Sequence, residues 1–257
     1  MRTNLFDLSK RVAIVTGSAR GLGQKLAEGL AEHGARVVVC DLNTEKARAA
    51  AERICAAGGE AVSTSVDVTD AESCEALVRF AVKTHGRVDV LVNNAGIDIV
   101  EPIGEISAEA WARVLGVDLA GVLNASQSVV RQMLRQGDGG SIISISSIAA
   151  LAAIPGLGAY SAAKSGVIQL TRVMALELAS KNIRVNAIAP GYLENIMEGM
   201  GPEHAKPETE QRIKTRTPMG RRARLSELVG PVVFLASEAA SYVTGAVLAV
   251  DGGYTAA

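Results

Sequence analysis

The sequence is poor in aromatic residues and carries almost no net charge. Phe, Trp and Tyr make up 3% of the 257 residues, although 48% of all residues are hydrophobic. The core must therefore be built from Ala, Val, Leu and Ile, a composition that suits parallel strands covered by helices on both faces. The 26 basic and 27 acidic residues leave a formal charge of −1. Without a basic field, we expect neither nucleic acid nor an anionic membrane as a partner.

Cysteine and histidine are also scarce, and neither forms a metal-ligand pattern. Cys40, Cys55 and Cys74 are odd in number and contain no CxxC pair, which fits unpaired thiols in a reducing cytoplasm. His33 and His85 each precede a glycine at an expected helix end, an ordinary position for histidine. The chain shows no signal-peptide pattern and no run approaching the roughly 18 apolar residues of a membrane span. We expect a cytoplasmic protein without a metal site.

What the sequence does contain is a regular alternation of short apolar runs with amphipathic segments. Strands joined by helical crossovers must lie parallel, and right-handed crossovers then give a doubly wound α/β sheet, a Rossmann fold. Because no linker or repeat divides the chain, we expect a single domain over residues 1–257. The expected strands are Val12–Thr16, Val37–Cys40, Ala61–Val66, Val88–Val92, Ser141–Ser146, Val185–Ala189 and Val247–Val250.

Helix signals between these runs set the expected helix boundaries. Gly34 ends the first helix, and Thr69 and Glu72, spaced as a capping box, predict the start of the third. Residues 194–216 depart from this alternation of strands and helices, because they are rich in charged residues, Gly and Pro. A long irregular insertion there predicts a mobile substrate flap. The other expected helices cover Thr44–Ala57, a segment from near Ser107 past Met133, and Ala159–Ser180.

A glycine-rich turn joins the first strand to the first helix over Thr16–Gly23. Gly17 permits the tight turn, Gly21 lets the backbone approach a pyrophosphate, and Gly23 allows the helix to pack against the strand. The helix N-terminus then offers free N–H groups to the phosphates. Such turns also occur as plain structural turns, but the strand-turn-helix context favours a nucleotide site.

Asp41, at the end of the second expected strand, bears on the choice of nucleotide. A carboxylate there accepts hydrogen bonds from ribose hydroxyls and repels a 2′-phosphate, which favours NAD over NADP. Arg20 favours NADP instead, since a cation there can pair with the 2′-phosphate. The simpler interpretation of Arg20 is a solvated loop residue. We therefore expect NAD as the cofactor.

Tyr160, Lys164 and Ser147 form the candidate catalytic set. Oxidation of an alcohol needs a base for the hydroxyl proton, and a free tyrosine, with a pKa of about 10, is a poor base at neutral pH. Lys164 lies four residues later on the same helical face and favours the phenolate. Ser147, at the end of the fifth strand, can stabilise charge on the substrate oxygen. A Tyr–Lys pair alone is usually a packed aromatic beside a solvated amine; the serine and the nucleotide loop favour catalysis.

In this combination the sequence resembles the short-chain dehydrogenase/reductase family over essentially its whole length. The resemblance implies a Rossmann fold, nicotinamide hydride transfer and a homotetramer, with a small alcohol or ketone as substrate. It also implies that Asp67 and Val68 flank the adenine, that Asn93 supports that wall, and that Pro190, Gly191 and Leu193 approach the nicotinamide. Ser18, Leu22, Ala95 and Gly96, together with Tyr160 and Lys164, complete the implied cofactor contacts. The matching motifs are Thr16–Gly23, Asp67-Val68, Asn93–Gly96, Ser147, Tyr160–Lys164, Pro190-Gly191 and Asp251–Gly253.

Two positions depart from the family pattern. Asp118 stands where the family usually has an Asn that holds, through its backbone, a water in a proton relay to the lysine. A backbone role survives the change, whereas a carboxylate near Lys164 would stabilise the ammonium. We expect an active enzyme with Asp118 in the relay. Asn195 stands where relatives often have Thr, which leaves its contact with the nicotinamide amide open.

The sequence leaves the substrate open among several classes. The segment 216–221 and the C-terminal part resemble family members that oxidise sugar acids, and also 3-oxoacyl-acyl-carrier-protein reductases. Asp41 favours the NAD-linked oxidative role, so we expect a polyol, sugar or sugar acid first and an oxoacyl group second. A catalytically silent nucleotide-binding scaffold is a remote alternative that only Asp118 supports. Candidate anion-binding residues are Arg212, Lys214 and Arg216.

Overall fold

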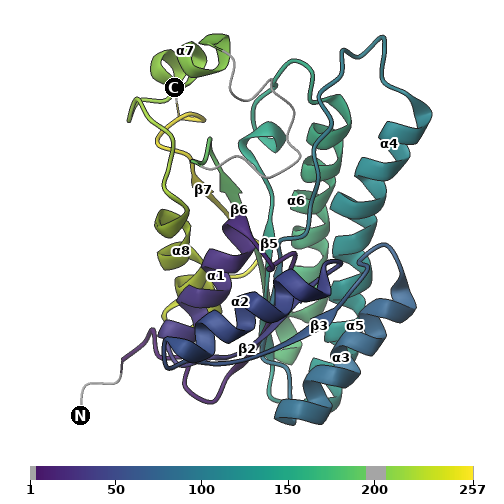
Figure 1. The fold of residues 1–257 in the computed structure, drawn as a ribbon, viewed down its shortest axis with the longest axis vertical. Coiled ribbons are helices and arrows are strands. Elements are labelled where there is room, and N and C mark those ends of the chain that lie inside the picture. Colours follow the sequence, from purple (N-terminus) through teal and green to yellow (C-terminus); the bar gives the residue numbers. More distant parts are fainter. Residues whose placement is uncertain (1–3, 195–206, 257) are drawn as a thin grey trace.

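The computed structural model describes residues 4–194 and 207–256 and contains one parallel sheet of seven strands. The strand order is β3-β2-β1-β4-β5-β6-β7. Strands β1 to β3 are therefore added toward one edge of the sheet and strands β4 to β7 toward the other, and the order reverses between β1 and β4. The predicted doubly wound parallel sheet is thereby confirmed (Figure 1). The strands are β1 Val12–Thr16, β2 Arg36–Asp41, β3 Glu60–Ser65, β4 Val90–Asn93, β5 Gly140–Ile145, β6 Ile183–Pro190 and β7 Val247–Val250.

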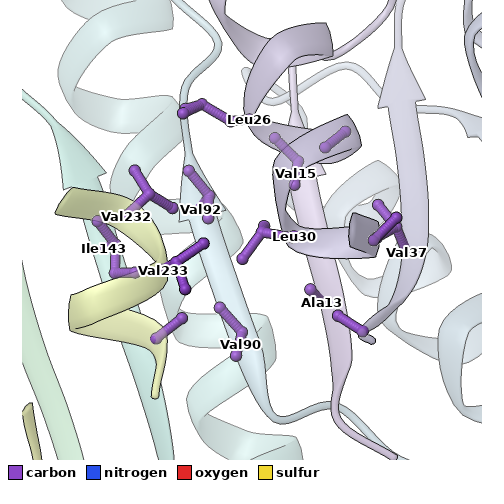
Figure 2. Close-up of a cluster of buried hydrophobic side chains, with 14 of the residues drawn as sticks. Ala13, Val15, Leu26, Leu30, Val37, Val90, Val92, Ile143, Val232 and Val233 are labelled. Atoms are coloured by element: carbon purple, nitrogen blue, oxygen red, sulfur yellow. The ribbon is translucent and has the colours of Figure 1, made fainter. Parts of the chain in front are cut away.

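Helices cover both faces of this sheet. Figure 1 shows α1, α2 and α8 on one side and α3, α5 and α6 on the other. On the first side, Leu26 and Leu30 of α1 and Val232 of α8 pack over strand residues such as Val15 and Val92 (Figure 2). The helices are α1 Gly21–Glu32, α2 Thr44–Ala56, α3 Ala71–His85, α4 Ala108–Leu115, α5 Gly121–Gln136, α6 Gly158–Leu178, α7 Pro207–Arg216 and α8 Val229–Ala236.

The expected start of the fourth strand is wrong by two residues, because a side-chain network replaces the ladder there. Asp89 is buried before β4, and its carboxylate accepts the N–H of Val12 at 2.9 Å. The same carboxylate pairs with Arg87 at 2.7 Å. Residues 88 and 89 are therefore held by side-chain contacts and by two backbone hydrogen bonds, from the Asp89 N–H to the Val12 carbonyl and from the Ser141 N–H to the Asp89 carbonyl. Pairing with β1 begins only at Val90.

The expected cap of α3 is also wrong. Asp70, not Thr69, is the N-cap, and its carboxylate accepts the N–H groups of Glu72 and Ser73 at 3.0 and 3.2 Å. The Thr69 hydroxyl instead donates to Asp67 at 2.6 Å. An Asp directly before the helix satisfies two N–H groups that a Thr one residue earlier does not reach.

The long helix expected after Ser107 is interrupted by a π-helical turn. Between α4 and α5, Gly116–Ala120 form this turn, in which the N–H of Gly121 donates to the carbonyl of Gly116. Such widened turns occur mostly at functional sites, because they redirect a side chain without ending the helix. Here the turn carries the buried Asp118.

The expected flap falls partly outside the described residues. Of the range 194–216, residues 195–206 lie outside them, and residues 207–216 form α7 rather than an irregular loop. The segment after α7 packs against the C-terminal residues: the N–H of Met219 donates to the carbonyl of Gly252 at 3.1 Å. Within the described part of the chain, no helix has both the length and the apolar character needed to cross a membrane.

Candidate active site

A pocket opens at the carboxyl ends of the central strands, where the strand order reverses. In open α/β sheets this crevice is the usual ligand site. Ser147, Tyr160 and Lys164 line the pocket together with residues of the glycine-rich turn and of the segment after β6. The described lining is Leu22, Asn94, Gly96, Asp98, Asp118, Ile145, Ser146, Ser147, Ile148, Ile154, Leu157, Tyr160, Lys164, Pro190, Gly191, Tyr192, Leu193, Arg222 and Leu225.

The three glycines of the first turn differ in what surrounds them. Gly17 has φ +62°, and a Cβ there would lie 2.8 Å from the Ala95 backbone. A Cβ on Gly23 would collide with the Gly17 carbonyl oxygen and the Asn94 side chain. Gly21 has φ +55° and no atom within 4 Å of a built Cβ. Gly17 and Gly23 are thus fixed by packing, whereas Gly21 leaves open space at the N-terminus of α1, which fits a phosphate group.

Ser18 and Asp41 connect this turn to β2. The Ser18 hydroxyl donates to the Val15 carbonyl at 2.6 Å and accepts the N–H of Cys40 at 3.0 Å, so this buried side chain supports the turn from within. Asp41 Oδ2 accepts the N–H of Ala19 at 3.3 Å, which holds the carboxylate at the turn where the sequence analysis expects a ribose. Arg20 is exposed on the same turn.

Two asparagines at the carboxyl end of β4 fix the opposite wall. Asn93 is buried, and its amide donates to Ser126 and Ser144 at 3.0 and 3.3 Å, which supports its expected role behind the wall. Asn94, to which the sequence analysis assigned no separate role, donates to the carbonyls of Thr16 and Gly17 at 3.0 and 2.9 Å. Asn94 therefore clamps the glycine-rich turn against β4.

The candidate catalytic residues come together from two elements. Ser147 directly follows β5, and its hydroxyl accepts the N–H of Ala149 at 3.1 Å. Tyr160 lies in the first turn of α6, and Lys164 lies one turn later. The Lys164 ammonium is 5.4 Å from the centroid of the Tyr160 ring and donates to the Ile145 carbonyl at 3.1 Å. The expected spacing on one helical face therefore places the ammonium beside the phenol.

Asp118 reaches this set through its side chain. Its Oδ2 lies 3.0 Å from Lys164 Nζ, and its Oδ1 accepts the N–H of Ile97 at 2.8 Å. Lys164 is 3% exposed and Asp118 is 0% exposed, so the ion pair is shielded from solvent. The structure thus gives Asp118 a direct side-chain contact that the family's backbone role does not require.

The pKa values of these three groups depend on one another. Burial raises the pKa of Tyr160, the Lys164 ammonium lowers it in part, and Asp118 raises it again. Burial alone would lower the pKa of Lys164, but Asp118 and Tyr160 more than offset this effect, so that pKa is raised. Burial likewise raises the pKa of Asp118 against the opposing effects of Lys164 and the Ile97 N–H. The proton on Tyr160 is held tightly in this arrangement.

The remaining predicted residues lie at or after the carboxyl ends of β3 and β6. Val68 is buried and packs on Gly121, where a Cβ would lie 2.7 Å from the valine side chain. Asp67 caps its own turn by accepting the N–H of Thr69 at 2.9 Å. Pro190, Gly191 and Leu193 line the pocket after β6. Asn195 lies outside the described residues.

Arg222 is a charged pocket residue that the sequence does not predict. It lines the pocket, whereas Arg212, Lys214 and Arg216, the expected anion-binding residues, are not among the described lining. Glu210 of α7 accepts from Arg222 Nε and Nη2 at 2.9 and 2.7 Å, and the Leu193 carbonyl accepts from Nη1 at 3.1 Å. Arg222 is one of three arginines between residues 221 and 224, and nothing in the sequence distinguishes which of them faces the site.

Known proteins match this chain over its full length. The profile of a family described as enoyl-(acyl carrier protein) reductase matches residues 17–255. The 2-dehydro-3-deoxy-D-gluconate 5-dehydrogenase of Dickeya dadantii (strain 3937) is 41% identical over 256 residues and covers 100% of both chains. The cis-4-hydroxycyclohexanecarboxylate dehydrogenase of Sinomonas cyclohexanicum is 43% identical over 249 residues, which are 96% of this chain and 98% of the relative.

A solved structure agrees with these matches. A gluconate 5-dehydrogenase from Burkholderia cenocepacia J2315, in complex with NADP and tartrate, superposes with a TM-score of 0.94 at 38% identity. The superposition covers 99% of this chain and 98% of that chain.

Proposed function

Because this chain belongs to the short-chain dehydrogenase/reductase family and is an NAD(P)-dependent oxidoreductase acting on CH–OH groups, we propose that, among polyols, sugars and sugar acids, its substrate is a sugar acid or a similar small hydroxy acid. The observation that carries this proposal is Arg222 in the pocket beside Ser147 and Tyr160. The pocket's described lining contains two cations. Lys164 pairs with Asp118, which also lines the pocket, whereas Arg222 pairs with Glu210, which is not among the described lining. A guanidinium held in this way can bind the carboxylate of a substrate.

The residues divide the work of the reaction as follows. The nicotinamide ring, when bound, supplies the hydride acceptor or donor. Ser147 Oγ donates a hydrogen bond to the substrate oxygen and stabilises the charge that develops there. Tyr160 Oη takes the hydroxyl proton during oxidation and returns it during reduction. Lys164 favours the phenolate, and Asp118 holds the lysine in place.

Gly21 and the N-terminus of α1 would hold the pyrophosphate of the cofactor. The open space at Gly21 supports this placement, since no atom lies within 4 Å of a Cβ built there. Gly17, Ser18, Leu22 and Gly23 form or support that turn, and Asp67, Val68, Asn93, Ala95 and Gly96 form the opposite wall. Asp41 favours NAD over NADP, because its carboxylate is held at the turn where a 2′-phosphate would lie. Titration of both cofactors tests this preference; a strong kinetic preference for NADPH would contradict it.

We also propose a homotetramer that works in the cytoplasm. Exposed apolar side chains on α5 and α6 support association, among them Leu123, Leu134, Val173 and Leu176. The three cysteines are all free thiols, which suits a reducing compartment. The Glu210–Arg222 ion pair at 2.7 Å ties α7, which lies within the range expected for a substrate flap, to the pocket.

The substrate proposal is tested by comparing acids with their neutral analogues. NADH formation is followed with a panel of hydroxy acids, the matching methyl esters or amides, and 3-oxoacyl thioesters in the reverse direction. We expect acids to be preferred, and R222L to raise their KM by about ten-fold or more while kcat changes little. R222K is the matched control and should keep part of the affinity. Equal KM for acids and esters would contradict the carboxylate role, and faster turnover of oxoacyl thioesters would favour the reductase alternative.

A further inference from the structure

Asp118 and Lys164 form a buried ion pair that lines the pocket. Both carboxylate oxygens are engaged, Oδ2 by the ammonium at 3.0 Å and Oδ1 by the Ile97 N–H at 2.8 Å. A Cβ on Gly96 would lie 2.9 Å from Asp118 Oδ2 and 3.3 Å from Lys164 Nζ, so only a glycine lets the backbone pass this close. The pair is therefore covered by main chain as well as buried.

The charges of this ion pair determine the electrostatic field at the Tyr160 hydroxyl. An ammonium alone beside a phenol favours the phenolate. A carboxylate 3.0 Å from that ammonium cancels part of its field at a third group, because the two opposite charges act together as a dipole. Tyr160 thus faces an ion pair rather than an isolated positive charge, with the effect of Lys164 still larger than that of Asp118.

The other groups around Tyr160 do not restore the positive field. Tyr160 packs against an apolar cluster of Val114, Ala159 and Ala163, which Ile97, Ile99 and Leu119 also contact. Asp98 adds a further negative charge that raises the Tyr160 pKa, and the Ser147 hydroxyl lowers it through a hydrogen bond. Arg222 lines the same pocket but pairs with Glu210.

We propose that Asp118 is a positioning residue that keeps Lys164 charged but weakens its field on Tyr160, so that alcohol oxidation requires a higher pH than it would with asparagine at this position. The inference rests on the proton-transfer role proposed for Tyr160. Its consequence is an enzyme poised for ketone reduction near neutral pH and for oxidation in more alkaline solution, since reduction needs the protonated phenol and oxidation the phenolate.

D118N removes the charge and keeps the shape of the side chain. Asparagine has one acceptor oxygen where aspartate has two, so its Oδ1 accepts from the Lys164 ammonium or from the Ile97 N–H, and its Nδ2 accepts from neither. In D118N we expect the acidic limb of the kcat/KM profile for oxidation to move down by about one pH unit or more, which raises the rate several-fold on that limb. The basic limb should also move down, because the buried Lys164 loses its counter-charge. The control D138N removes an exposed carboxylate near the amino end of β5 and should leave the profile unchanged.

A second measurement does not depend on turnover. Ultraviolet titration of tyrosinate in the cofactor-free protein, with the signal of Y160F subtracted, isolates Tyr160 from the other three of the four tyrosines. We expect a lower midpoint in D118N than in the wild type; an equal or higher midpoint would overturn the inference. If the midpoint falls but no hydroxylated substrate is oxidised, the charge relation stands and the proposed function fails.

Discussion

At the residue scale, single atoms decide whether the nucleotide turn can form. Asn94 clamps the turn by donating to the Gly17 carbonyl at 2.9 Å, and Gly23 lies so close to both that a methyl group has no room. Gly21, two residues earlier, faces open space. The three glycines therefore serve different purposes, two for packing and one for access.

Gly23→Ala should destabilise the protein and weaken cofactor binding together. The added Cβ forces the turn and Asn94 apart, and overpacking of this kind costs about 1–3 kcal/mol. Gly58→Ala is the matched control, since Gly58 has φ +89° but nothing within 4 Å of a built Cβ. It should cost about 1 kcal/mol through backbone strain and leave cofactor affinity unchanged. Denaturant unfolding and cofactor titration check both; normal cofactor binding in Gly23→Ala would contradict the packing argument.

At the scale of elements, caps and side-chain anchors set the boundaries. Asp70 caps α3 by accepting two N–H groups, and Asp89 delays the start of β4 by binding Val12 and Arg87. The π-turn Gly116–Ala120 joins α4 and α5 without ending the helix, and it directs the Asp118 side chain toward Lys164.

Asp70→Ala should lower the free energy of unfolding by about 1 kcal/mol, because two N–H groups at the start of α3 lose their acceptor. Thr69→Ala is the control and should cost less than half of that, since its hydroxyl only donates to Asp67 at an exposed site. Urea unfolding measures both variants. A larger loss in Thr69→Ala than in Asp70→Ala would restore Thr69 as the cap.

The elements that sequence patterns predict well are those with local causes. Buried apolar runs and terminal glycines place the strands and the helices α1, α2, α3 and α6 within about two residues. Thr16–Gly23 and the Tyr160–Lys164 spacing place the site, because strand ends and helix turns fix geometry over short range. The family resemblance brings Asp118 into the relay to Lys164. Its direct contact with the lysine, the Asn94 clamp and the position of Arg222 depend on contacts between distant segments, so no local pattern reveals them.

At the scale of the whole molecule, the doubly wound topology gathers these residues. The glycine-rich turn follows β1, the two asparagines lie at the carboxyl end of β4, and Ser147 follows β5. These three neighbouring strands run parallel. Their carboxyl ends meet at one edge, so residues as far apart in sequence as Leu22 and Leu225 line one crevice. Helices on both faces shield the sheet, and α6 brings Tyr160 to the same edge (Figure 1).

The central claim is that Tyr160 transfers the proton when a hydroxy acid is oxidised. The most direct measurement is the initial rate of NADH formation with a panel of hydroxy acids, for the wild type and for Y160F, at matched cofactor saturation. We predict that at least one acid is oxidised by the wild type and that Y160F lowers its kcat by at least about 100-fold while cofactor binding is retained. A Y160F variant that turns over that acid at the wild-type rate would contradict the account.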